Sequence, residues 1–552
     1  MKFNLPSSET SNLFETKLET TNFEKILQHV DREQLSIFRD LDKLEEIYLL
    51  LNIDKFEKKE FRIHLLNHAF GNTKFKKFCL QINQSIISKN SSDLEKQKFV
   101  NKIATFDWAD NFHTHAFVES FDLDEGIIPK EKSSSENIEM IEQPISTYSP
   151  MFFYQDEIWN AVKEKLSETA GRAIMQLPTG GGKTKVSMEI VTDFFNNNSN
   201  STVVWLAQTS ELLEQAINEF KQIWKHRGNS SISINRAWGK NDVIPEIEGS
   251  KLVVGGLSKM ISFFKKNGKM KADLIIFDEA HHASAEKYYE TLLDLGIPGK
   301  TKVLGLTATP GRGNEKETEE LVKVFNDNSP IQINTHDEYL GPIGFLQKQG
   351  VLSKIRTGGD KIIKIPKLDV ELTKAEINKL LKTSEYNDLK ILKKIGQSHI
   401  RNVIIFKKLY ELMNEDKQII YFGTSVEQAK LMYVLLSNFN FKVGFVDAQT
   451  SPEYRAELIR KFQKKEIKCL LNYAVLIAGF DAPSIDTVFI GRLTKSANTL
   501  FQMIGRGMRG PSVVGGTKFC DVYHVQDKFL ERFQNYEQLY ETYDAYYERE
   551  QF

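Results

Sequence analysis

The segment FQMIGRGMRG, residues 501–510, places two arginines three positions apart between glycines. If the segment is helical, that spacing puts the guanidinium groups of Arg506 and Arg509 on one face. A guanidinium is a planar fork that matches phosphate or carboxylate, and two held side by side repel each other unless an anion lies between them. The segment therefore predicts half of an anion site, whose other half must come from elsewhere in the chain.

A glycine-rich turn is the candidate for that other half. The stretch RAIMQLPTGGGKTKVSMEI, residues 172–190, has the pattern of a strand, a turn and a helix start. Glycines let backbone N–H groups cup phosphate oxygens, and the helix N-terminus adds partial positive charge. A lysine would reach the β and γ phosphates of a nucleotide such as ATP, and a hydroxyl would ligate Mg²⁺. The residues expected here are Thr179, Gly180, Gly181, Gly182, Lys183 and Thr184.

The turn departs from the strict phosphate-loop pattern, because Leu177 stands where that pattern has glycine. The alternative is a flexible glycine turn with an incidental lysine. The preceding strand pattern and the following helix pattern favour phosphate binding over that alternative.

Such a loop needs a carboxylate partner for its metal. The stretch LIIFDEAHH, residues 274–282, supplies Asp278 and Glu279 directly after an apolar strand. Asp278 would hold Mg²⁺ through its water shell, and Glu279 would orient or deprotonate the attacking water. Acidic residues are also favoured at helix N-termini, so the pair acquires this meaning only together with the phosphate loop.

Composition limits the other possibilities. The 552 residues carry 73 basic and 74 acidic side chains, so any polyanion contact must be confined to a groove. Three cysteines without a CxxC pair argue against a disulfide framework or a zinc finger. His113 and His115 lie close to Asp110, but no second cluster completes a metal site, and ordinary loop histidines are the favoured interpretation. No stretch approaches membrane-spanning length, and we expect a cytoplasmic protein without a membrane partner.

The arrangement of apolar residues predicts how these motifs are positioned. Helical spacing dominates the first part of the chain, whereas from residue 150 short apolar strands alternate with helix-length segments. Such alternation predicts doubly wound parallel sheets, and it occurs twice, giving an α/β fold behind an all-α N-terminal domain. The expected divisions are a helical domain (1–127), a linker (128–149), a first sheet domain (150–325), a basic connecting segment (326–405), a second sheet domain (406–528) and a C-terminal helix (529–552).

Four motifs occur in a characteristic order. PTGGGKT, DEAH at 278–281, TAT at 307–309 and QMIGRGMR at 502–509 resemble the ordered motifs of superfamily 2 DEAH-type helicases. The stretches GLTATPGR (305–312) and LLNYAVLIAGFDAPSIDTVFI (470–490) are most similar to the RadD-like and restriction-type branch. The resemblance implies two tandem RecA-like domains that bind ATP and Mg²⁺ in the cleft between them, with a nucleic-acid strand lying across the top.

The same resemblance implies roles for individual residues. Gln155 would read the adenine edge, Gln502 would position the water or the γ phosphate, and Arg506 and Arg509 would be arginine fingers supplied by the second domain. Thr307 and Thr309, together with His281, would couple the state of the γ phosphate to the grip on the nucleic-acid strand. Gly479 and Asp481 would approach the nucleotide from the second domain.

Contacts to the phosphodiester backbone are expected where strands end. Relatives use hydroxyls, amides and basic groups there, because backbone contacts need no base edges. The matching residues are Gln208, Thr209, Ser258 and Thr424. Each hydroxyl could equally cap the next helix.

The predicted function is therefore that of an ATP-dependent helicase or translocase moving on nucleic acid, with DNA favoured over RNA. Genome maintenance and defence against phage are both compatible with it. The alternative is a nucleic-acid-stimulated ATPase that acts as a sensor and signals to a protein partner through the N-terminal helices without unwinding. Both use the same motifs, so the motor residues do not separate them.

Overall fold

The computed structural model describes most of the chain between residues 56 and 530. The described residues are 56, 58–88, 91–121, 123, 128, 138–141, 150–207, 210–239, 241, 244, 248–267, 271–278, 295–308, 325, 329–335, 341–382, 388–477 and 482–530.

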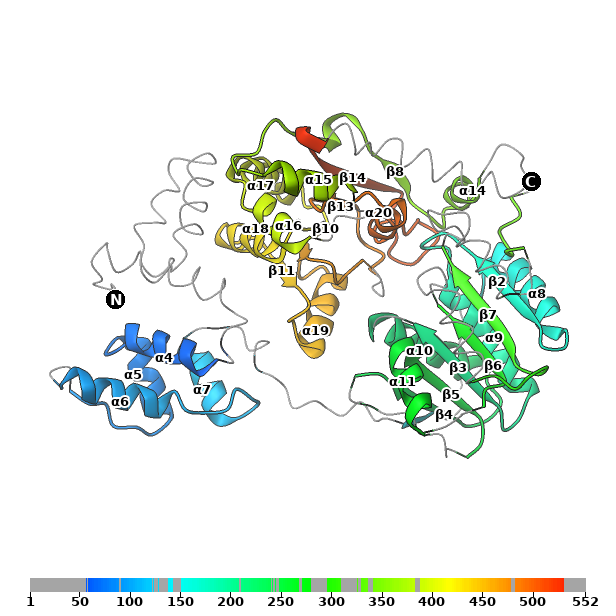
Figure 1. Cartoon of the computed structure of the whole chain (residues 1–552), viewed down its shortest axis with the longest axis horizontal. Coiled ribbons are helices and arrows are strands. Elements are labelled where there is room, and N and C mark those ends of the chain that lie inside the picture. Colours follow the sequence, from blue (N-terminus) through cyan, green and yellow to red (C-terminus); the bar gives the residue numbers. More distant parts are fainter. Residues whose placement is uncertain are drawn as a thin grey trace.

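The described part of the N-terminal region is helical. Its helices are α4 (Lys59–His68), α5 (Thr73–Gln81), α6 (Asp93–Ile103) and α7 (Phe112–Ser120), drawn in blue in Figure 1. Asn72 caps α5 with its side chain, and Ser92 and Glu95 form a capping box at the start of α6. The apolar faces of these helices enclose a core of their own, which includes Phe75 and Phe117. Residues 1–55 of the predicted all-α domain lie outside the described residues.

The first sheet contains the phosphate-loop strand. Its strands are β1 (Ile138–Ile141), β2 (Arg172–Gln176), β3 (Thr202–Ala207), β4 (Ile232–Ala237), β5 (Lys251–Gly256), β6 (Leu274–Phe277) and β7 (Lys302–Thr307). They lie in the order β1-β4-β5-β3-β6-β7-β2, and only the β1–β4 pair is antiparallel among the described strands. Part of the predicted linker, 138–141, is thus an edge strand of this domain.

Both faces of the first sheet are buried. Along β3, Val203 and Trp205 belong to one core, while Val204 and Leu206 belong to the other, as the two-residue period of a strand requires. Burial on both faces is typical of parallel sheets. Helices α8 (Phe153–Ser167), α9 (Lys183–Asn197) and α10 (Ser210–Arg227) cover the first face, and α11 (Leu257–Asn267) covers the second.

The second sheet is entirely parallel in the described residues. Its strands are β8 (Lys354–Arg356), β9 (Ile362–Ile365), β10 (Ile419–Phe422), β11 (Val443–Val446), β12 (Cys469–Asn472), β13 (Thr487–Ile490) and β14 (Phe519–Asp527). The order is β11-β12-β10-β13-β14-β8, with β9 also pairing with β14. Helices α17 (His399–Asn414) and α18 (Val426–Asn438) cover one face, and α19 (Pro452–Gln463) and α20 (Ala497–Ile504) cover the other. The predicted α/β class with two doubly wound parallel sheets is confirmed.

The expected connecting segment contributes to this second sheet. Strands β8 and β9 pair with β14, and the expected boundary at residue 405 falls inside α17. Short strands whose partner lies far away in sequence leave little local signal, because the pairing itself stabilises them. The segment also contains α14 (Pro342–Lys348), the short 3₁₀ turn η5 (Gly359–Lys361), α15 (Lys374–Lys382) and α16 (Leu389–Gly396); a last 3₁₀ turn, η6 (Lys528–Leu530), follows β14.

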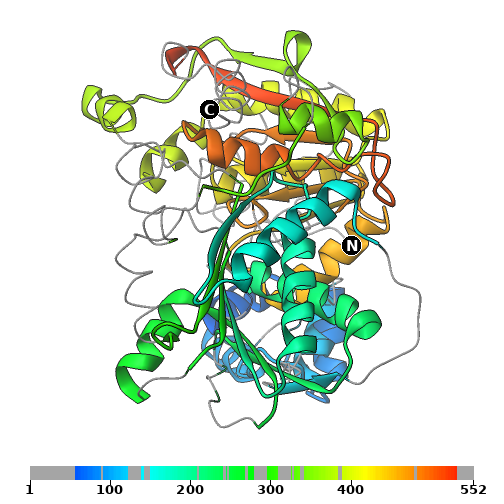
Figure 2. The ribbon, with the colours of Figure 1, turned by 90° about the vertical axis from the view of Figure 1, so that its right-hand side faces the viewer.

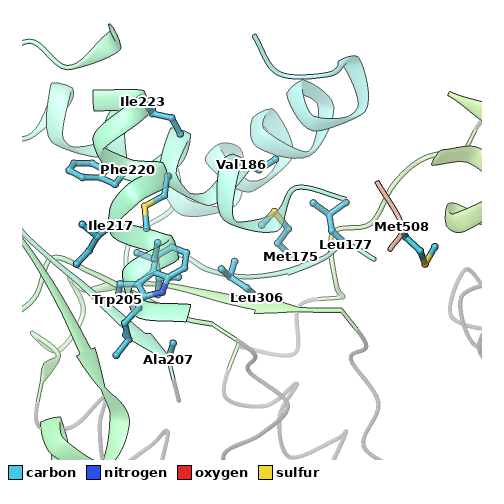
Figure 3. Packing of buried hydrophobic residues seen from close by; sticks show 14 of the residues in the cluster. Met175, Leu177, Val186, Trp205, Ala207, Ile217, Phe220, Ile223, Leu306 and Met508 are labelled. Atoms are coloured by element: carbon cyan, nitrogen blue, oxygen red, sulfur yellow. The ribbon is translucent and has the colours of Figure 1, made fainter. Parts of the chain in front are cut away.

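The two sheet domains, seen one above the other in Figure 2, share one apolar cluster. It joins Leu177 after β2, Leu346 of α14, Leu352 and Met508 after α20. Figure 3 shows Met508 on the side of the cluster where Leu177 lies. The phosphate loop and the arginine segment therefore meet at a packed joint. Within the described residues, no helix combines the length and apolar composition needed to cross a bilayer.

Candidate phosphate site between the two sheet domains

The glycine turn adopts the conformation expected of a phosphate-binding loop. Gly180 and Gly182 have φ angles of 90° and 85°, in the left-handed region that favours glycine. Helix α9 begins at Lys183 with Gly182 as its N-cap, so its free N–H groups face the turn. The Lys183 ammonium lies 3.1 Å from the carbonyl oxygen of Leu177. This arrangement concentrates positive charge at the turn and suits a bound phosphate.

Two buried side chains of α8 hold the turn from beneath. The Tyr154 hydroxyl donates to the carbonyl of Gly181 at 2.8 Å, and Nε2 of Gln155 donates to the same oxygen at 3.2 Å. Gln155 is 3% exposed, its Oε1 accepts from the N–H of Phe152, and a Cβ on Gly182 would overlap with its amide. The structure thus places Gln155, expected at an adenine edge, under the phosphate loop. Burial raises the pKa of Tyr154, so its hydroxyl stays protonated and remains a donor.

Tyr154 was not singled out in the sequence, although it directly precedes Gln155. Replacing Tyr154 with phenylalanine removes one hydrogen bond to the loop while keeping the ring. We expect KM for ATP to rise about fivefold, because a neutral hydrogen bond contributes about 1 kcal/mol. Steady-state hydrolysis measures this, with Tyr410→Phe on α17 as a matched control. An unchanged KM in Tyr154→Phe would show that the loop does not depend on this bond.

The expected metal-binding residues lie at one edge of the first sheet. Asp278 follows β6, Thr307 ends β7 and the phosphate loop follows β2, and these strands are neighbours in the order β6-β7-β2. Asp278 is 8% exposed, and its N–H donates to the carbonyl of Leu206, which holds it at the strand end. A carboxylate and the Thr184 hydroxyl are hard oxygen ligands of the kind Mg²⁺ prefers. The residues present therefore fit Mg²⁺ beside a bound phosphate.

The arginine segment differs from the expected helix. Helix α20 ends at Ile504, so Arg506 and Arg509 lie in a turn and an irregular stretch beyond it. Glycines at 505, 507 and 510 account for this end, because glycine is a poor helix former. The Arg506 Nε donates to the carbonyl of Gln502 at 3.2 Å. The shared helical face was a wrong expectation for these arginines.

The structure nevertheless brings one of the two arginines to the phosphate loop. A Cβ placed on Gly180 would lie 2.6 Å from Nη1 of Arg509, and a Cβ on Gly505 would overlap with the side chain of Thr179. Arg509 also lies close enough to Tyr154 to lower the pKa of that hydroxyl, against the larger effect of burial. Residues more than 300 positions apart in the sequence, in two domains, thus form one cationic site.

The backbone of Arg509 is fixed by a turn that the sequence did not reveal. The carbonyl of Arg509 accepts from the Ser353 hydroxyl at 2.8 Å and from the N–H of Thr517 at 2.7 Å. The N–H of Gly510 donates to the carbonyl of Val351. Ser353 is fully buried and lies just before β8. No local signal marks these residues, because each acts through a partner about 160 positions away.

The residues expected to contact the phosphodiester backbone of nucleic acid lie in different environments. Thr424 is fully buried: its hydroxyl donates to the carbonyl of Gly491 at 2.8 Å and accepts from Nη1 of Arg401 at 2.6 Å. It is a structural residue, and its prediction as a nucleic-acid contact is wrong. The cap of α18 is instead Ser425. Ser258 is the second residue of α11.

Most of the other predicted site residues fall outside the part of the chain that the structure describes. Gln208, Thr209, Glu279, His281, Thr309, Gly479 and Asp481 lie outside the described residues. Gln502, on α20, is 8% exposed. In the N-terminal helices, Nε2 of His115 lies 2.7 Å from the carboxylate of Asp110. The described residues contain no group of three or more metal-ligating side chains of the His, Cys, Asp and Glu types.

Comparisons with known proteins agree with this arrangement. A family model described as "Type III restriction enzyme, res subunit" matches residues 149–312, and one described as "Helicase conserved C-terminal domain" matches residues 403–510. A Saccharomyces cerevisiae protein named "Putative ATP-dependent helicase IRC3" is 26% identical over 367 residues, which are 64% of this chain and 49% of the relative. "Putative helicase 22" of a Sulfolobus islandicus filamentous virus is 26% identical over 398 residues, covering 68% of this chain and 64% of the relative.

Solved structures with similar folds include Saccharomyces cerevisiae Dbp5 bound to RNA and ADP BeF3, with a TM-score of 0.48 and 15% identity over 71% of this chain and 87% of that one. Another is the Pyrococcus furiosus Hef helicase domain, with a TM-score of 0.42 and 17% identity over 70% of this chain and 97% of that one.

Two doubly wound domains with a candidate phosphate site at their joint define a class of two-domain phosphate-loop proteins. Both family models match in the expected order, and together with the relative from Saccharomyces cerevisiae they support a superfamily 2 helicase of the restriction-type branch. It spans about half to two thirds of the length of the two curated relatives described above.

Proposed function

We propose that the protein is an ATP-dependent motor that couples hydrolysis between its two sheet domains to movement on nucleic acid. The observation that carries the proposal is the position of Arg509, which belongs to the second domain and lies beside Gly180 of the first. Phosphate held in the loop would be contacted from both domains at once. Hydrolysis and phosphate release would remove that shared contact, so the joint would open and close with each cycle.

Each part of the site has a role in this cycle. Lys183 and the N-terminus of α9 would bind the β and γ phosphates, and Thr184 and Asp278 would hold Mg²⁺, which neutralises charge on those phosphates when bound. Glu279 would orient the attacking water, and Arg509, with Arg506, would stabilise charge that develops in the transition state. Tyr154 and Gln155 would keep the loop in its binding conformation through the carbonyl of Gly181.

The polymer is nucleic acid, and we favour DNA over RNA because the restriction-type family model covers the first domain. Work on foreign DNA or on damaged DNA in the cytoplasm would suit such a motor. The formal net charge of −1 argues for a local groove rather than a generally basic surface.

The direct test is steady-state ATP hydrolysis by the full chain, alone and with single- and double-stranded DNA and RNA. We expect at least one polymer to raise kcat, with Lys183→Ala as the control for contaminating ATPase. Hydrolysis that ignores all four polymers would contradict the motor.

A sensor that signals through the N-terminal helices is the second candidate. These helices have a core of their own, yet they expose Leu80, Leu94 and Phe112 by 70%, 63% and 61%. Exposed large apolar side chains are common at protein-binding surfaces. A strand-displacement assay on a duplex with a short overhang separates the candidates: a motor releases the labelled strand, whereas a sensor shows polymer-stimulated ATPase without release.

A further inference from the structure

Three neighbouring strands of the second sheet end beside Arg492. Strands β12, β10 and β13 are neighbours, and the residues that follow them are Tyr473, Gly423 and Gly491. Arg492 directly follows Gly491, and its guanidinium carbon lies 5.7 Å from the centre of the Tyr473 ring. A cation over an aromatic face is attracted by the ring quadrupole.

The Arg492 guanidinium has no hydrogen-bond acceptor among the described residues. Its Nε and Nη1 are both buried and unbonded. The residue as a whole is half-buried. Most buried polar atoms in proteins are paired, so these two nitrogens are exceptions. By contrast, the neighbouring Arg401 satisfies Nε, Nη1 and Nη2 with protein acceptors. The missing acceptor is thus specific to Arg492.

The groups around Arg492 do not supply that acceptor. Glu427, in the first turn of α18, acts electrostatically on Tyr473, but its carboxylate lies 2.6 Å from the ammonium of Lys393. Burial raises the pKa of Tyr473, so its hydroxyl remains neutral. Next to it, Ala474 has a φ angle of 60°, a strained conformation for a residue with a side chain. Such strain clusters at functional sites.

We propose that Arg492, with the ring of Tyr473 beneath it, binds a phosphodiester group of the bound polynucleotide. The inference rests on the proposed function, because it assigns a contact to the same polymer. Drawing the fork toward a phosphate gives its unbonded nitrogens an acceptor, and guanidinium matches phosphate oxygens in two-pronged geometry. Such a contact grips the strand without reading its sequence.

The nucleotide phosphates are a less suitable ligand for Arg492. Helix α20, of 8 residues, lies between Arg492 and Arg506 in the chain, and a helix of that length spans about 12 Å. Arg509, at the far end, is the residue beside Gly180. Arg492 is therefore placed at the strand-end edge of the second sheet, where parallel sheets bind ligands, and not at the phosphate loop.

The test uses the full chain and fluorescein-labelled single-stranded DNA and RNA, with anisotropy measured over a salt series. In Arg492→Ala we expect affinity to fall about tenfold, as for loss of one charge-assisted hydrogen bond pair. The slope of log affinity against log salt should shrink by about 0.7, the value for one phosphate contact on a single strand. Arg492→Lys should keep the slope and recover part of the affinity, and Arg460→Ala, an exposed arginine on α19, should match the unsubstituted chain.

Two further readouts distinguish other outcomes. Fluorescent ADP should bind Arg492→Ala as tightly as the unsubstituted chain, and thermal stability should stay level or rise, because two buried nitrogens without an acceptor are removed. Weaker ADP binding with unchanged polymer binding would overturn the proposal in favour of a nucleotide contact. A lower Tm with unchanged polymer affinity and slope would overturn it in favour of a structural role. If the unsubstituted chain binds neither polymer, the proposed function itself fails.

Discussion

Replacing Arg509 with alanine lowers kcat for polymer-stimulated ATP hydrolysis by about 10³-fold, the usual effect of removing an arginine finger. The guanidinium lies beside Gly180 and is the described cation of the second domain that the structure brings to the phosphate loop. In the proposed mechanism Arg509 stabilises charge that develops during phosphoryl transfer, so we expect its loss to act mainly on kcat and ATP binding through Lys183 to be largely retained. Stopped-flow binding of a fluorescent nucleotide and steady-state hydrolysis measure the two parameters separately.

The variant Arg509→Lys separates the effect of the positive charge from that of the planar guanidinium group. Lysine keeps the charge but lacks the planar fork, so we expect it to restore only a small part of kcat. Arg460→Ala serves as the matched control on the same domain. If Arg509→Ala hydrolyses ATP within twofold of the unsubstituted chain, the joint does not participate in catalysis and the proposed coupling is wrong.

Replacing Arg401 with alanine destabilises the second sheet domain by about 3–5 kcal/mol. The side chains of Arg401 and Asp527 are both fully buried, and Nε of Arg401 lies 3.0 Å from Oδ1 of Asp527. Nη2 donates to the carbonyl of Gly491 at 2.7 Å, and Nη1 donates to Thr424. One guanidinium thus ties α17 to the ends of β10, β13 and β14, and its removal leaves Asp527 as an uncompensated buried charge.

Hydrogen exchange followed by mass spectrometry reports this loss locally, which matters because a multidomain chain does not unfold in one step. Peptides covering β10 and β14 should exchange faster in Arg401→Ala, while peptides of β3 and β5 in the first sheet should not change. The double variant Arg401→Met with Asp527→Leu should recover most of the protection, because no charge is left unpaired. Equal exchange rates in Arg401→Ala and the unsubstituted chain would contradict the role of Arg401 in holding these strands together.

The phosphate loop shows how much local sequence determines. Three glycines between an apolar strand and a helix leave few conformations for residues 180–182, and the structure has left-handed φ angles at Gly180 and Gly182. The same holds for β3, whose residues are apolar on both faces of the strand. Successive side chains of β3 therefore pack into the two different cores. These features depend on neighbours within a few positions, so one sequence suffices to predict them.

The protein partners of Gln155 and Thr424 could not be predicted from the sequence. Both are polar residues beside motifs, and both were expected to meet a ligand. In the structure Gln155 is bonded to the carbonyl of Gly181, and Thr424 to Gly491 and Arg401. A buried polar side chain must find a partner, and the partner is chosen by packing between segments far apart in the sequence.

The sequence by itself determined the fold class, the glycine turn before α9, the carboxylate after β6 and the presence of a separate arginine-containing segment, because each depends on a short run of residues. Only the tertiary structure decided that β8 and β9 complete the second sheet, that Ser353 holds the backbone of Arg509, and that Arg492 has no acceptor among the described residues. These are pairings between distant residues, and their energies depend on burial and geometry that no local pattern records.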